Sequence, residues 1–197
     1  MLLSQSDFYT FAGNNEIAMT DTIRVKDKIF SVFIEGKTID SATQRVADKI
    51  NIDTKDENPL FLIILNGAFM FAADLLKKVS VDCNISFVKL ASYSGTQSTS
   101  VVTELIGLNE DLNGRSVVIV EDIIDTGKTL EVLLKRLKEH NAGKVRIASL
   151  LFKPHAFKCD YPIDYVGIEI PNDFIVGYGL DYDGFARNLP DIYKIVE

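Results

Sequence analysis

Solid apolar runs and amphipathic segments alternate along the chain. Two runs of consecutive apolar residues, Leu60–Leu65 and 117–120, predict buried strands, and the largely apolar stretch Val145–Leu151 predicts a third. Additional strands are predicted at Ile85–Ala91, Val101–Ile106 and Tyr165–Ile170. A turn is expected at Asn109–Gly114, between the strands Val101–Ile106 and 117–120.

The segments between these strands have helical spacing. Apolar residues recur at near-helical intervals over 39–50, where Thr38 is available as a cap, and Phe69–Val79 and Leu130–His140 are amphipathic in the same way. Strands that alternate with helices favour an α/β fold, with a parallel sheet and helices on both of its faces.

Chemistry concentrates where the strand 117–120 ends. Two adjacent carboxylates, Glu121 and Asp122, follow the strand, and a short turn with Thr126, Gly127 and Thr129 then leads into the next helix. A glycine-containing turn at a helix start directs unpaired backbone N–H groups and the positive end of the helix dipole at one point, which suits a phosphate. The sequence therefore predicts a phosphate cradle.

This cradle is not a Walker A loop, because the glycine required five positions before Gly127 is replaced by Asp122. Two carboxylates beside a phosphate would repel it unless they accept hydrogen bonds from neutral hydroxyl groups or face it through a divalent cation. A ribose diol together with Mg²⁺ meets both conditions.

These residues resemble a known motif. The run Glu121-Asp122-Ile123-Ile124-Asp125-Thr126-Gly127-Lys128-Thr129 is similar to the phosphoribosyl pyrophosphate motif of the type I phosphoribosyltransferases, most closely the hypoxanthine-guanine branch. The resemblance extends from about Leu60 to Arg187. It implies a type I phosphoribosyltransferase fold, in which helices flank a central parallel sheet and both chain ends build a small hood.

The resemblance also assigns roles on the phosphate side. Asp125 would be the general base or proton carrier, within a 5′-phosphate loop formed by Asp125, Thr126, Gly127, Lys128 and Thr129. Glu121 and Asp122 would face the ribose hydroxyls and the metal, and Asp181 would bind Mg²⁺.

On the purine side, Lys153 would donate to the 6-oxo group of the base, although a lone lysine after a strand is more often simply solvated. Phe174 would stack on the purine, the backbone of Ile175 would read its edge, and Asp181 would complete the purine site. Because lysine has donors and no acceptor, it favours a 6-oxopurine over adenine.

The pyrophosphate would contact Asn66, Gly67 and Arg187. Many relatives carry a lysine at the position of Asn66, so pyrophosphate affinity is where this chain is expected to differ. Ser92 and Tyr93 resemble the start of a lid, and the run Ser92–Ser100 has too little apolar surface to fix it, so a mobile loop is expected there.

Composition narrows the remaining choices. A chain of 197 residues with 47% hydrophobic content is expected to form one domain, 1–197, with 1–21 as a flexible N-terminal extension. The formal charge of −7 argues against a nucleic-acid surface. The two cysteines and two histidines, Cys83, Cys159, His140 and His155, fit no metal spacing and are interpreted as structural or solvated.

No secretory signal and no membrane-crossing stretch is recognisable, so a cytoplasmic location is expected. We expect a magnesium-dependent enzyme of purine salvage, hypoxanthine (guanine) phosphoribosyltransferase in type. Its substrates would be phosphoribosyl pyrophosphate and a 6-oxopurine, and the resemblance implies a homodimer or homotetramer. The alternatives are a xanthine-preferring relative and a non-catalytic regulator that binds phosphoribosyl pyrophosphate.

Overall fold

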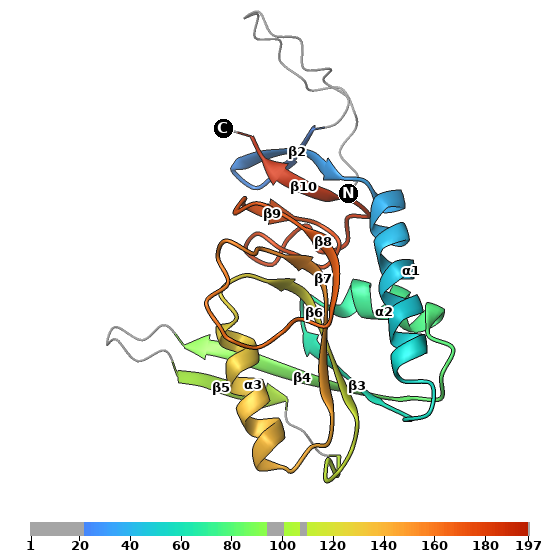
Figure 1. Ribbon diagram of the computed structural model, residues 1–197. Coiled ribbons are helices and arrows are strands. Elements are labelled where there is room, and N and C mark those ends of the chain that lie inside the picture. Colours follow the sequence, from blue (N-terminus) through green and yellow to red (C-terminus); the bar gives the residue numbers. More distant parts are fainter. Residues whose placement is uncertain (1–21, 94–100, 107–109, 197) are drawn as a thin grey trace, which may run out of the picture.

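The computed structural model describes residues 22–93, 101–106 and 110–196, which form a central sheet with flanking helices and a smaller second sheet (Figure 1). The order along the chain is β1 (Thr22–Val25), β2 (Lys28–Ile34), α1 (Gly36–Asp53), β3 (Leu60–Leu65), α2 (Phe69–Lys78), β4 (Asn84–Tyr93), β5 (Val101–Ile106), β6 (Val117–Ile124), α3 (Lys128–Glu139), β7 (Val145–Phe152), β8 (Tyr165–Glu169), β9 (Ile175–Val176) and β10 (Ile192–Ile195).

The central sheet has the strand order β5-β4-β3-β6-β7-β8. Its strands β4, β3, β6, β7 and β8 are mutually parallel, and β5 is antiparallel to β4. The predicted α/β class with a parallel sheet is therefore confirmed.

Helices cover both faces of this sheet, as predicted (Figure 1). Alternate residues of β3 show the division: Phe61 and Ile63 pack in the cluster that contains α1 and α2, whereas Leu62 packs with α3. The strand is buried on both sides, which explains why its sequence is continuously apolar rather than alternating.

The second sheet has the order β1-β2-β10-β9, with every pair antiparallel. It joins residues from both chain ends, since Ile34 of β2 pairs with Ile192 of β10. This sheet lies beyond the carboxyl ends of the central strands in Figure 1, and its small core is formed by Val25, Phe30, Val176 and Tyr193. The predicted hood is present, and we refer to the second sheet as the hood.

Two local predictions were wrong. Thr38 does not cap α1, because the helix begins two residues earlier, at Gly36, whose N–H donates to a carboxylate oxygen of Asp191 at 2.6 Å. Strand β6 does not end at residue 120 but continues to Ile124, since its ladder with β7 persists from Glu121 opposite Ser149 to Ile124 opposite Phe152.

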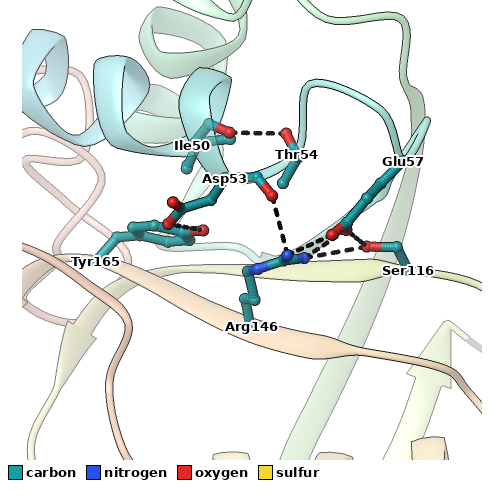
Figure 2. A network of polar contacts seen from close by, with 7 residues as sticks. All are labelled: Ile50, Asp53, Thr54, Glu57, Ser116, Arg146 and Tyr165. Atoms are coloured by element: carbon teal, nitrogen blue, oxygen red, sulfur yellow. Dashed lines mark hydrogen bonds and ion pairs between the residues drawn. The ribbon is translucent and has the colours of Figure 1, made fainter.

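A partly buried polar network ties the amino ends of the parallel strands to the end of α1 (Figure 2). Arg146, whose side chain is 3% exposed, donates two hydrogen bonds of 2.6 Å to the Glu57 carboxylate and one to the Asp53 carbonyl. Ser116 also donates to Glu57, and Tyr165 donates to the Asp53 carboxylate. This network lies at the end of the sheet opposite to the carboxyl edge described below.

No helix in the described ranges 22–93, 101–106 and 110–196 is long and apolar enough to cross a membrane.

Candidate active site

The carboxyl ends of β3, β6 and β7 lie side by side and bring the predicted site residues to one edge of the sheet. Because Glu121 and Asp122 are consecutive residues within β6, they point to opposite faces of the strand. Glu121 is buried beside the turn that follows β6, whereas Asp122 lies against Gly67, at the turn after β3.

Both carboxyl groups are held in surroundings that disfavour their charge. Burial, followed by the neighbouring charge of Asp122, raises the pKa of Glu121 well above its ordinary value. Asp122 keeps some contact with solvent, but the protein around it raises its pKa to about 6, with burial as the largest cause and the Arg187 charge acting in the opposite sense. Glu121 Oε2 is buried without a hydrogen-bond partner among the described residues.

The predicted phosphate loop forms a turn between β6 and α3. Gly127 has a φ of 86°, in the left-handed region that glycine tolerates, and α3 begins directly after it at Lys128. A hollow of about 100 Å³ lies at this turn, and it is lined by Glu121, Ile123, Ile124, Asp125, Thr126, Gly127, Lys128, Thr129 and Leu130. Lys128 and Thr129 belong to the first helical turn rather than to the loop, so α3 starts two residues before its predicted first residue.

Asp125 and Lys153 form an ion pair across the ends of β6 and β7. The Lys153 ammonium lies 3.2 Å from Asp125 Oδ2. The backbone N–H of Lys153 donates to the carbonyl of Ile124 at 2.9 Å. The lysine side chain is only 10% exposed, so it is not the solvated lysine that its isolated sequence position allows. This pairing leaves no local trace in the sequence, because the two residues are 28 positions apart.

A second group of predicted residues meets around Gly67. A side chain at Gly67 would overlap the Asp122 carboxylate, and a side chain at Gly179 would overlap the Gly67 carbonyl. Gly179 has a φ of 100° and exchanges backbone and side-chain hydrogen bonds with Arg187, whose guanidinium donates to the Gly179 carbonyl at 2.6 Å. Asn66 is exposed in the same turn, and the Leu65–Asn66 peptide bond is cis.

Asp181 is the remaining acid of this group. One of its carboxylate oxygens lies 2.6 Å from Arg187 Nη2, and the other accepts a hydrogen bond from the Gly184 N–H. In the described part of the chain, no three His, Cys, Asp or Glu side chains converge to hold a metal by themselves. His140 ends α3 in an exposed position, and both cysteines are free and partly buried.

Phe174 and Ile175 enter from the hood. The Phe174 residue is 45% exposed, and its ring is held at an edge-on angle to Tyr182, 5.8 Å between centroids, and 6.1 Å from Phe30. Ile175 is buried in β9, paired with Lys194 of β10.

Ser92 and Tyr93 are the last two residues of β4, so the predicted lid begins within a strand. The remainder of that prediction, 94–100, lies outside the described residues, as does the predicted extension 1–21.

Sequence reasoning missed the residues that support the site from behind. Tyr161 and Cys159 touch the phosphate loop, and Tyr178 donates to Asp74 of α2 at 2.6 Å. The Gly-Tyr-Gly run at 177–179 was the available signal for the last of these, because two glycines that flank one aromatic residue indicate a constrained backbone.

The carboxyl edge of this parallel sheet brings together a glycine-containing turn before a helix, two adjacent carboxylates and a second turn at Gly67, which is the arrangement in which α/β folds bind ligands. The family model for the phosphoribosyl transferase domain matches residues 35–183. The chain therefore belongs to the phosphoribosyl transferase family.

Curated relatives and solved structures show which members of this family the chain is similar to. The hypoxanthine-guanine phosphoribosyltransferase of Streptococcus pneumoniae R6 is 38% identical over 174 residues, which cover 88% of this chain and 97% of that protein. The enzyme of the same name from Mycobacterium bovis is 39% identical over 168 residues, covering 82% and 83%.

Among solved structures, a hypoxanthine-guanine phosphoribosyltransferase of Bacillus anthracis superimposes with a TM-score of 0.79 at 35% identity, covering 84% of this chain and 98% of that one. A hypoxanthine phosphoribosyl transferase of Trypanosoma cruzi, studied for the role of its C-terminal region in oligomeric state and activity, gives a TM-score of 0.79 at 30% identity, covering 88% and 95%.

Proposed function

We propose that this protein is a purine-salvage enzyme that transfers the 5-phosphoribosyl group from phosphoribosyl pyrophosphate to hypoxanthine or guanine. The products are the nucleoside monophosphate and pyrophosphate. The relatives named above support this reaction class, and one local observation supports it independently: the ion pair of Lys153 and Asp125 beside the phosphate loop.

This pair matches one edge of a 6-oxopurine. The 6-oxo group and N7 are neighbours on that edge of the base. Lys153 offers donors to the oxo group, and Asp125 offers an acceptor to a proton on N7, so one purine can replace the ion pair by two new hydrogen bonds. Adenine would place an amino donor against the lysine, which leaves both donors without an acceptor.

The proposed reaction breaks the bond between ribose C1 and a pyrophosphate oxygen and forms a bond from C1 to a purine nitrogen. The proton lost from the imidazole ring passes to Asp125. The N–H groups around Gly127 and at the start of α3 hold the 5′-phosphate. The pyrophosphate is bound at the turn of Gly67, which lies close to Asp122 and to Gly179, and Arg187 beside Gly179 contacts it as well. Phe174 would stack on the base.

The acids of the site fit Mg²⁺. This ion prefers carboxylate oxygens and is typically bound through one or two of them together with substrate phosphates, which is consistent with the lack of a three-residue metal cluster among the described residues. We propose that one or two of three carboxylates hold it. Asp122 and Asp181 lie on the side of Gly67, whereas Glu121 points to the opposite face of β6 and has a buried oxygen without a partner among the described residues. Bound Mg²⁺ would supply positive charge to the leaving pyrophosphate.

Four expectations remain predictions. The lid that begins at Ser92 and Tyr93 and the homodimer or homotetramer rest on the family resemblance, whereas the single domain and the cytoplasmic location rest on the composition and pattern of the sequence.

Initial rates test the function. Purified protein with phosphoribosyl pyrophosphate and Mg²⁺ is given hypoxanthine, guanine, xanthine or adenine in turn, and pyrophosphate release is measured. We expect turnover with hypoxanthine or guanine and little with adenine. A preference for xanthine would favour the first alternative, and binding of phosphoribosyl pyrophosphate without turnover of any base would favour a regulator.

A further inference from the structure

The segment that follows Lys153 packs against the back of the phosphate loop. A methyl group added at Gly127 would lie 2.7 Å from the Tyr161 hydroxyl, 2.8 Å from Cys159 Sγ and 2.8 Å from the Phe157 ring. Three side chains of this segment therefore close over one Cα atom. They leave room only for glycine, at the residue whose φ of 86° also favours glycine.

This segment also supplies hydrogen bonds to the carbonyl groups of the loop. Tyr161 donates its hydroxyl to the Gly127 carbonyl at 2.6 Å, and the same oxygen accepts the helical bond from the Glu131 N–H at 3.0 Å. One residue earlier, the Thr126 carbonyl lies 3.5 Å from Cys159 Sγ and 3.4 Å from the Lys158 N–H.

Holding these carbonyl groups fixes the donors on the opposite side. In a trans peptide the C=O and the following N–H point in opposite directions within one plane. The Gly127 carbonyl shares its plane with the Lys128 N–H, and the Thr126 carbonyl shares its plane with the Gly127 N–H. Because both carbonyls face Tyr161 and its neighbours, both N–H groups face away from them, on the side where a helix N-terminus binds phosphate.

We propose that Tyr161 is a positioning residue for phosphate binding: its hydroxyl orients the Gly127–Lys128 peptide so that the loop is already aligned when the 5′-phosphate arrives. This inference rests on the proposed function for the identity of the phosphorylated ligand. Burial raises the pKa of Tyr161 above its ordinary value of 10, so the hydroxyl keeps its proton and remains a donor at neutral pH. Tyr161 itself does not need to touch the ligand.

The variant Tyr161→Phe removes the hydroxyl and keeps the ring. The matched control is Tyr165→Phe, which removes a comparable hydroxyl, one that donates to Asp53 at 3.0 Å at the opposite end of the sheet (Figure 2). For each protein, isothermal titration calorimetry measures dissociation constants for inosine monophosphate and for inosine, which differ only in the 5′-phosphate. The KM values for phosphoribosyl pyrophosphate and hypoxanthine are determined as well. Thermal midpoints report stability.

We expect Tyr161→Phe to weaken the binding of inosine monophosphate about fivefold, which is the effect of losing one neutral hydrogen bond. The KM for phosphoribosyl pyrophosphate should rise by a similar factor, while the constants for inosine and hypoxanthine stay within about twofold of wild type. Tyr165→Phe should lower the thermal midpoint without changing the ratio between the two dissociation constants.

The positioning role would be overturned if Tyr161→Phe left the ratio of the two constants, for inosine monophosphate over inosine, at its wild-type value. Equal weakening of the nucleotide and the nucleoside is one form of that outcome. An equal change of the ratio in Tyr165→Phe would also overturn it, because the effect would then report general stability. A wild-type protein that turns over no purine base would refute the proposed function instead. The ratio needs no turnover, so the two failures are distinguishable.

Discussion

Replacement of Glu57 by glutamine removes one charge from the network at the amino end of the sheet (Figure 2). Two hydrogen bonds from Arg146 are the largest cause that lowers the pKa of Glu57, from 4.5 to about 2. At about 1.36 kcal/mol per pKa unit, this shift of about 2.5 units corresponds to about 3 kcal/mol of stability at neutral pH. The variant leaves the Arg146 guanidinium, with its 3% exposed side chain, without its ion-pair partner.

The sign of the pH dependence follows from the lowered pKa. Because the folded protein holds the charged form of Glu57 more favourably than the unfolded chain, the contribution is fully present above pH 4.5 and is lost as the pH falls toward 2. The free-energy difference between wild type and Glu57→Gln should therefore be about 3 kcal/mol at pH 7 and about half of that between pH 3 and 4. Urea unfolding at a series of pH values measures it.

Asp56→Asn is the neighbouring control. Oδ2 of Asp56 lies 3.8 Å from Nζ of Lys55, and both side chains are more than 70% exposed. Loss of this surface pair should therefore change the free energy of unfolding by less than about 0.5 kcal/mol. The reasoning fails if Glu57→Gln is as stable as Asp56→Asn at pH 7. It fails equally if the difference from wild type is the same at pH 3 as at pH 7.

Three predictions concern the site. Asp125→Asn removes the proton acceptor and keeps the shape of the loop, so kcat should fall roughly a hundredfold while the KM for phosphoribosyl pyrophosphate stays nearly constant; unaltered kcat in steady-state assays would falsify the role. Lys153→Gln should lower the ratio of kcat/KM for hypoxanthine to kcat/KM for adenine, because an amide presents either a donor or an acceptor to the 6-position of the purine. A ratio equal to that of the wild type would show that Lys153 does not recognise this position. Gly179→Ala should displace the Gly67 carbonyl and raise the KM for phosphoribosyl pyrophosphate more than that for hypoxanthine, and equal KM values in wild type and variant would contradict this.

The strands and helices could be predicted because their burial leaves a periodic trace. Leu60–Leu65 is apolar throughout because both faces of β3 are covered, and the stripe of Leu130, Leu133 and Leu137 on α3 is buried against one of them. The end of β6 could not be predicted in the same way. Glu121 and Asp122 are polar residues inside a strand, held there by the ladder with β7, so hydrophobic pattern alone placed the boundary too early.

Contacts between distant residues leave no local trace. The start of α1 depends on Asp191, 155 residues away in the chain, and the close approach of Gly67 and Gly179 joins two turns that are also far apart. The motif at 121–129 identified the phosphate loop because one continuous segment forms it. The residues that support this loop from behind, Cys159 and Tyr161, belong to another segment and became visible only in the structure.

The pairing of β2 with β10 also constrains how the protein can be made. Residues 28–34 are synthesised before the central sheet and can pair with β1 at once, but their second partner, residues 192–195, is synthesised only after the whole of that sheet. Closing so long a loop carries an entropic cost that local contacts do not share, which slows the step. The hood is therefore completed only after the phosphate loop and the strands around it have been synthesised. A nascent chain can have a folded phosphate loop before it has the completed hood next to Phe174.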